Sequence, residues 1–225
     1  METAAASFGP RARRTREKLK AAAAEAMADL GVGKVKVADV TERAGVAVGL
    51  FYRYFPDLPA LLTEVASDWA AHANAAAEAT PEHAHPFDML RAETLALVRC
   101  VSAAPQIFQA VVQATGALPE VAPVWRAGHE RWTRRRLKRI GDAFPGGRAA
   151  AEALVQGQAN LLDGFLQEYF LRANADLRRL APTEAHIAEL IAIVMYRALF
   201  LAPPPADRVA FYADAAALGA PEATR

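Results

Sequence analysis

The sequence predicts an all-α protein, built from an N-terminal three-helix unit and a larger C-terminal helical domain, with about nine or ten helices in all. Two observations predict this fold. Apolar residues recur at helical spacing between prolines and glycines, and no segment shows the alternating pattern of a β-strand. Because 53% of the 225 residues are apolar, the chain can bury a sizeable core.

Three helices are expected in the first quarter of the chain, at 15–30, 37–44 and 48–54. Thr15 is the expected N-cap of the first helix, and Gly31 ends it. Pro56 ends the third, and Asp57 then caps a longer helix that leads out of this region. The remaining helices are expected near 86–103, 105–115, 119–144, 147–174, 183–202 and 205–218.

Charge is distributed unevenly along the chain. Residues 1–55 hold 10 Lys and Arg against 6 Asp and Glu, whereas residues 56–225 hold 16 against 19. A basic N-terminal quarter indicates an anion-binding end, and nucleic acid is the first candidate for the anion.

Residues 37–55 carry the most informative pattern, because two short helices are joined there by the tight turn Gly45-Val46-Ala47. Six apolar side chains are spaced to form a small core with the first helix: Val37, Val40, Ala44, Val46, Phe51 and Phe55. This arrangement is typical of a helix-turn-helix, whose second helix lies in the major groove of DNA.

The run from Val37 to Leu62 resembles the DNA-binding signature of the TetR family. Its segment Ala-Gly-Val-x-x-Gly-x-Phe-Tyr-x-Tyr-Phe is far more demanding than a generic helix-turn-helix. The resemblance covers roughly Thr15 to Val65. It implies a DNA-binding transcriptional regulator with four segments: a basic flexible arm at 1–14, a helix-turn-helix domain at 15–56, a helical ligand-sensing and dimerisation domain at 57–219, and a tail at 220–225.

By position, the resemblance makes 48–54 the recognition helix. It implies that Tyr52 gives its hydroxyl to a backbone phosphate and that Tyr54 lies at the margin of the groove. The residues expected to face the base edges are Val48, Gly49, Leu50 and Arg53.

Three positions depart from the family pattern. Ala47 stands where a Ser or Thr usually caps the recognition helix, Lys36 replaces the cap hydroxyl of the preceding helix, and Leu58 replaces a phosphate-contacting Lys. Each lost cap costs about 1 kcal/mol. Compensating cations are expected at Lys34, Lys36 and Arg43, and in the arm at Arg11, Arg13, Arg14, Arg16 and Lys18. The arm either enters an adjacent minor groove or stays a solvated tail.

In the family, a pocket in the C-terminal domain binds a small molecule that controls DNA affinity. Candidate contacts combine aromatic rings with a few polar groups, as ligand pockets do: Trp69, Phe108, Gln113, Trp125, His129, Asn160, Phe165 and Tyr169. Because fixed charges are few among them, we expect a mostly apolar organic molecule as inducer, and no cofactor.

Dimerisation is expected through the helices near 147–174 and 183–202, because both are strongly apolar and the family forms a four-helix interface from such a pair. Gly157 and Gly164 lie one heptad apart on the first of them, and each costs about 1 kcal/mol against Ala unless a close helix contact compensates for it. A homodimer places two recognition helices about one DNA turn apart, roughly 34–36 Å, and predicts a palindromic operator.

Several other functions find little support. No enzyme motif is recognisable, the lone Cys100 excludes a cysteine-rich metal site, and His83 and His85 have no recognisable third ligand for a metal. The basic run 131–139 suggests a second DNA site, but a solvated helix face is favoured. With no signal peptide and no span for a bilayer, the protein is expected in the cytoplasm. The alternative function is a helical interaction protein with degenerate DNA binding, because of Ala47 and Leu58.

Arg53 is the expected guanine reader, since Val48 and Leu50 can only contact thymine methyl groups. Arg53→Ala should weaken operator binding by about 1–3 kcal/mol and relax discrimination at one base position. Affinities for the operator and for random DNA measure both effects. An equal loss on the two DNAs would make Arg53 a phosphate contact instead.

Overall fold

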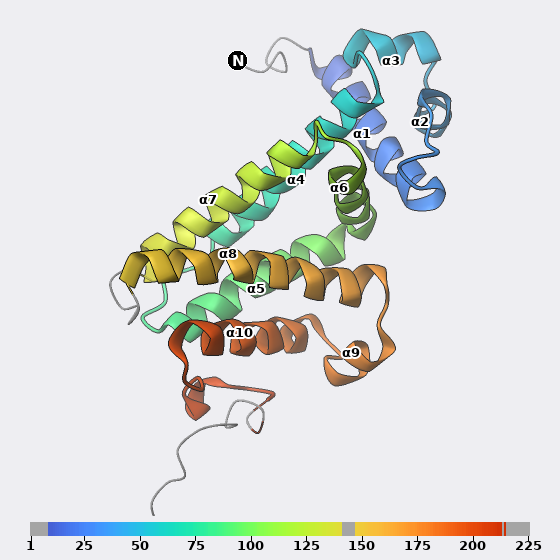
Figure 1. The fold of residues 1–225 in the computed structure, drawn as a ribbon. Helices are drawn as coiled ribbons and strands as arrows, with labels where there is room; N and C mark the ends of the chain where they lie inside the picture. The colour runs from blue at the N-terminus through green and yellow to red at the C-terminus, as the bar shows by residue number, and fades with distance from the viewer. Residues whose placement is uncertain (1–8, 141–146, 213, 215–225) are drawn as a thin grey trace, which may run out of the picture. The chain divides into compact units, whose positions relative to one another are not determined.

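The computed structural model describes residues 9–140, 147–212 and 214, and these residues form helices and connecting loops without a strand (Figure 1). Within them lie ten α-helices: α1 Pro10–Leu30, α2 Val37–Ala44, α3 Val48–Tyr54, α4 Leu58–Glu78, α5 Pro86–Ala103, α6 Pro105–Ala117, α7 Ala122–Ile140, α8 Gly147–Leu166, α9 Ala175–Leu180 and α10 Glu184–Phe200. A π-helical turn, η3 Gln167–Leu171, follows α8 directly, and a 3-10 turn, η4 Ala206–Arg208, follows α10. The all-α prediction is confirmed.

The chain divides into two compact units. The first holds Met1–Ala71 with Ala104–Ala127, and the second holds His72–Ala103 with Gly128–Arg225. This division differs from the one expected at residue 56, because the first half of α4 and all of α6 pack with the N-terminal helices. The unit boundaries fall inside α4 and α7, so each of these helices contributes to both units.

In the first unit, α2 and α6 both pack against α1, as Figure 1 shows. The apolar face of α1 drives this packing, because Leu19 and Met27 are fully buried. Val40 of α2 and Phe51 of α3 are also fully buried. These side chains form the small core expected from the sequence, although Val37, Ala44 and Val46 are only half-buried at its margin.

Helix α1 begins at Pro10, earlier than predicted. A proline suits the first turn of a helix, where its missing N–H would have no partner. Thr15 does not cap the helix; its hydroxyl donates to the carbonyl of Arg11 instead. Residues 10–14, predicted as part of a flexible arm, are therefore helical. Gly9 is the N-cap residue of α1, and residues 1–8 of the arm lie outside the described residues.

The helix expected at 147–174 is interrupted near its end. Its backbone passes from α8 into η3 and then turns at Ala173, which has a φ of 52°. Asn174 follows, and its side chain accepts the N–H of Leu177 at 3.1 Å, which begins the new helix α9. An Asn side chain competes with the backbone for such bonds and favours a cap over a helix interior.

In the second unit, α10 packs along α5 and α8 (Figure 1). The helix expected at 205–218 does not form over residues 205–212, which are non-helical after η4. Asp214 is helical, and residues 213 and 215–218 lie outside the described residues. The buried carboxylate of Glu189 on α10 accepts the N–H groups of Ala210, Phe211 and Tyr212. Side-chain acceptors therefore replace the carbonyls that a helix would supply. The tail predicted at 220–225 lies outside the described residues.

No single helix of the described residues is long and apolar enough to cross a membrane. Helices α5 and α6 together have the length and composition of a membrane span, but the pair is bent by 97°.

Candidate functional site

The turn between α2 and α3 has helix-turn-helix geometry. Gly45 ends α2 in the left-handed conformation, with a φ of 64°, which a residue with a Cβ adopts only at a cost. The N–H of Val46 then donates to the carbonyl of Thr41 at 3.0 Å, and this bond closes the end of α2. The chain turns sharply here and starts α3 three residues later.

Helix α3 has one buried face and one exposed face. Phe51 is fully buried, and Phe55, which follows the helix, is 2% exposed. On the opposite side, Val48 and Tyr52 are 47% and 56% exposed, although both are large and hydrophobic. The face of α3 that the sequence predicts to contact DNA is therefore exposed to solvent.

The other residues predicted to face the DNA bases are also at least partly exposed to solvent. Gly49 and Arg53 are exposed and Leu50 is half-buried. A Cβ built on Gly49 would meet no atom within 4 Å. The glycine is therefore not required for packing within this chain.

The two altered caps differ in their outcome. Ala47 offers no side-chain acceptor at the start of α3, so the cap expected to be lost there is lost. At the start of α2, the N–H of Lys36 donates to the carboxylate of Asp39 at 2.8 Å. Asp39, which lies in the first turn of α2, thus supplies part of the capping that the hydroxyl of a Ser or Thr at position 36 would have supplied.

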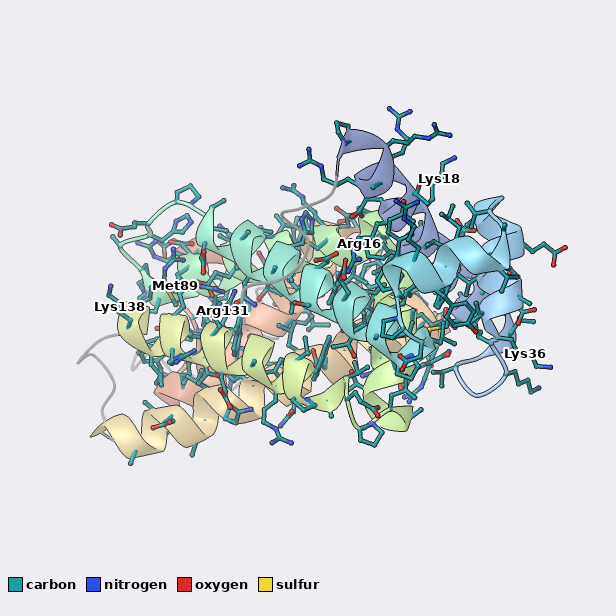
Figure 2. The ribbon with its side chains drawn as sticks, turned by 90° about the horizontal axis from the view of Figure 1, so that it is seen from above. Arg16, Lys18, Lys36, Met89, Arg131 and Lys138 are labelled. Atoms are coloured by element: carbon teal, nitrogen blue, oxygen red, sulfur yellow. The ribbon has the colours of Figure 1, made fainter. Side chains whose placement is uncertain are left out.

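The predicted cations of this region divide into exposed and paired groups. Lys18 and Lys36 are exposed, and Figure 2 shows them on α1 and at the loop before α2. Arg43 is exposed but pairs with Asp29, whose carboxylate lies 2.7 Å from its guanidinium. An exposed ion pair of this kind is worth about 0–1 kcal/mol, so a phosphate could compete with Asp29 for Arg43.

Arg16, predicted in the basic arm, takes part in the fold instead (Figure 2). Its side chain is only 15% exposed and pairs with Glu64 of α4. It also donates to the carbonyl of Tyr54 at 3.0 Å and lies 4.3 Å from the centre of the Phe55 ring. The Arg16–Glu64 pair therefore holds the last turn of α3 between α1 and α4, and Lys20 adds a second cation beside Glu64.

The eight predicted ligand contacts are divided equally between the two units. Trp69, Phe108, Gln113 and Trp125 belong to the first unit, and His129, Asn160, Phe165 and Tyr169 belong to the second. In the first unit, the Trp69 and Phe108 rings pack at 5.6 Å between centres, and Gln113 accepts the N–H of Val32 at 3.2 Å.

In the second unit, His129 lies 3.1 Å from Asp163, Asn160 is exposed, and the Tyr169 hydroxyl donates to the carbonyl of Ala181. One surface hollow of about 330 Å³ lies at Arg91 and Arg208, and another of about 370 Å³ lies at Leu30 and Glu42. None of the eight predicted residues lines either hollow.

The interior of the second unit contains a charged cluster that the sequence analysis missed. Three arginines of α7 converge on Glu93 of α5, and we name this group the Glu93 cluster: Glu93, Arg135, Arg136 and Arg139. Both Glu93 and Arg136 are buried. The basic run 131–139 is thus a solvated face only in part: Arg131 and Lys138 (Figure 2) are exposed, as is Arg134.

Helical spacing could have located this cluster. Arg136 follows Trp132 by four residues and precedes Ile140 by four, which places it on the same stripe of α7 as two apolar residues. Glu93 similarly lies three residues after Leu90 among apolar neighbours. A charge on an apolar stripe requires a buried partner.

Metal-ligating residues are not grouped in the described part of the chain: no three or more His, Cys, Asp or Glu side chains there could hold an ion. His85 has a structural role, because its Nδ1 accepts the N–H of Phe87 at the start of α5.

Comparisons with known proteins agree with this geometry. Residues 19–65 match the family of bacterial regulatory proteins called tetR. The N-terminal domain belongs to the TetR family. Over 82% of its length, the chain has the fold of solved transcriptional regulators. No curated protein matches the sequence at a significant level.

Solved structures, among them TetR-family regulators, share the fold at low sequence identity. A transcriptional regulator from Rhodococcus sp. Rha1 is 16% identical, with a TM-score of 0.67 over 82% of this chain and 97% of its own. The regulator PfmR from Thermus thermophilus is 18% identical, with a TM-score of 0.63 over 82% and 95%. RolR, solved with resorcinol, is 22% identical, with a TM-score of 0.52 over 84% and 89%.

The Arg16–Glu64 pair makes stability depend on pH. Burial alone would raise the pKa of Glu64, but the hydrogen bond and charge of Arg16, together with Lys20, hold the pKa below its ordinary value near 4.5. The pair's contribution to the free energy of unfolding is therefore complete above that value and is lost as the pH falls through the lowered pKa.

Glu64→Gln should lower the free energy of unfolding by about 1 kcal/mol at neutral pH, because the pair is partly exposed. The difference from the unmodified protein should shrink as the pH is lowered towards about 3. Urea unfolding across this range measures it, with the exposed Glu25→Gln as control. A difference that does not change with pH would contradict this account.

Proposed function

We propose that this protein is a ligand-responsive transcriptional repressor of the cytoplasm, which binds a palindromic operator as a homodimer and is released by a small molecule. The observation that carries the proposal is the two-faced recognition helix α3. Its buried face is held by Phe51 and by the Arg16–Glu64 pair, while Val48 and Tyr52 stand in water.

The exposed face of α3 suits the major groove, because it combines short residues at its front with a cation behind them. The proposed base contacts are Val48, Gly49, Leu50 and Arg53. The proposed phosphate contacts are Lys36, Arg43, Ala47 through its backbone, Tyr52 and, at the groove margin, Tyr54. Phosphate contacts position the protein, and base contacts select the sequence.

A homodimer through α8 and α10 is supported by the outer side of α8. Gly157 and Gly164 are exposed there, and a Cβ built on either would meet no atom within 4 Å. Their cost in helix propensity is therefore not offset by packing within the described residues, whereas a second copy of the helix could approach closely over them. Exposed leucines lie beside them and after α10, with Leu154 at 39% and Leu201 at 90% exposure.

Release by a small molecule is supported by the fold similarity to RolR, whose structure contains resorcinol. The proposed contacts in this chain are the half-buried His129, Phe165 and Tyr169 of the second unit. Trp69, Phe108 and Gln113 are occupied by packing and hydrogen bonds inside the first unit.

An interaction protein with degenerate DNA binding is the second candidate. It is favoured by the missing cap at Ala47 and by the pairing of Arg43 with Asp29. Both features weaken the expected contacts with phosphate.

Gly49→Ala separates the two candidates. Because the space at Gly49 is open, the added methyl should leave the free energy of unfolding unchanged or raise it by up to about 1 kcal/mol. Close approach to base edges should make the same methyl lower DNA affinity roughly tenfold, or about 1.4 kcal/mol.

The measurement is fluorescence anisotropy on DNA from upstream of the protein's own gene, over a range of salt concentrations. Gly116→Ala is the matched control, because Gly116 is an equally open, exposed glycine on α6. If the unmodified protein shows no salt-dependent binding at low salt, the repressor proposal is wrong and the interaction protein is favoured.

Gly157→Leu tests the dimer. Gly157 is exposed and a Cβ there meets no atom within 4 Å, so the folded state should persist, while a partner helix could no longer approach closely. We expect the molecular mass measured by light scattering to fall from that of a dimer to that of a monomer at micromolar concentrations. Gly116→Leu is the control, and a variant at Gly157 that stays fully dimeric would place the interface elsewhere.

A further inference from the structure

The Glu93 cluster holds more positive than negative charge. Arg136 donates from Nε and Nη2 to one oxygen of Glu93, at 3.2 and 2.8 Å. Arg139 donates to the other oxygen at 2.8 Å. Arg135 lies beside the same carboxylate, but its Nε is 3.9 Å from the nearest oxygen, beyond hydrogen-bond distance.

The charges of the Glu93 cluster do not balance. Glu93 is fully buried, and the three arginine side chains are only 12%, 0% and 23% exposed in sequence order. Glu78, which lies 3.7 Å from Arg135, is 56% exposed, so water screens its charge. A buried cation without a balancing anion is costly.

The other members of the cluster are satisfied. Arg136 also contacts Gln158 and the sulfur of Met195, and Trp132 lies over its guanidinium at 3.9 Å. Arg139 donates to Thr80 as well. The uncompensated positive charge is therefore concentrated at Arg135.

Arg135 also has unused hydrogen-bond donors. Its Nη1 donates to Asn74 at 3.1 Å, but its Nε and Nη2 are buried and have no hydrogen-bond acceptor among the described residues. The N–H groups of Nε and Nη2 point in the same direction, and this edge of a guanidinium matches the two oxygens of a carboxylate. Arg136 turns the same edge to Glu93.

Burial also lowers the pKa of Arg135, against the opposing effect of Glu93. A lowered pKa is expected for a desolvated cation whose charge no anion fully compensates.

We propose that the Nε and Nη2 edge of Arg135 binds the carboxylate group of the small molecule that this regulator senses. The inference rests on the proposed function and changes the expected ligand from a mostly apolar molecule to an organic acid. The acid supplies the second negative charge that the cluster lacks, and its two oxygens satisfy both unused donors. Binding would connect α4, through Asn74, and α5, through Glu93, more firmly to α7.

Matched acid and amide probes test the proposal on the full-length protein. Benzoate is compared with benzamide, and butyrate with butyramide, at equal concentration and ionic strength, with the unfolding temperature as readout. Each amide has the shape of its acid without the negative charge. At least one acid should raise Tm by roughly 2–4 °C, as a ligand of the folded state does, while its amide should not.

Arg135→Gln should abolish the difference between acid and amide. Arg135→Lys keeps the charge but lacks the paired donors, and it should weaken the acid's effect at least tenfold in concentration. Arg134→Gln is the control, because Arg134 is exposed on the same helix, and it should respond to the acid as the unmodified protein does.

Three results would overturn the proposal: no shift with either acid, equal shifts with an acid and its amide, or an acid shift that persists in Arg135→Gln. Because these measurements contain no DNA, their failure is distinct from failure of the proposed function, which DNA binding of the unmodified protein decides. An acid-specific shift in a protein that does not bind DNA would leave the site in place and reject the repressor.

Discussion

The burial of Phe51 and Phe55 decides which face of α3 is exposed to solvent. Phe51 and Phe55 are inserted into the core of the first unit, and each contributes about 1.5–3 kcal/mol by leaving water. This burial fixes the rotation of a helix that is too short to be stable alone. The opposite side, with Val48 and Tyr52, is thereby held in solvent.

The Arg16–Glu64 pair completes this arrangement at the end of α3. Arg16 uses three kinds of contact at once: an ion pair with Glu64, a hydrogen bond to the Tyr54 carbonyl and stacking on Phe55. A lysine could not make all three, because it lacks the planar guanidinium. Charge beside the exposed face of α3 is thus used for the fold.

The second unit uses charge in its interior. Glu93 is surrounded by arginines from one helix, and the hydrogen bonds of Arg136 extend to α8 through Gln158 and to α10 through Met195. Buried polar groups of this kind are weak contributors to stability but make the packing specific. The same helix α4 contributes Glu64 to the first arrangement and Asn74 to the second, so one element takes part in both.

The sequence by itself determined the helix-turn-helix, because the residues from Ala44 to Phe55 are close in the chain and their local chemistry specifies the turn. The left-handed backbone conformation at position 45 favours glycine, and the spacing of Phe51 and Phe55 already indicates which face of α3 is buried. The boundaries of α2, α3 and α5 follow from prolines, glycines and apolar period for the same reason.

Only the tertiary structure decided which charges are partners. Arg16 and Glu64, or Glu93 and Arg136, are distant in sequence. The apolar stripe of α7 marks Arg136 as buried, but nothing local identifies the carboxylate that pairs with it. The end of the chain is a similar case, because Glu189 takes the backbone N–H groups that a helix there would have used. Long-range electrostatic and hydrogen-bond partners are chosen by packing, and packing is a property of the whole chain.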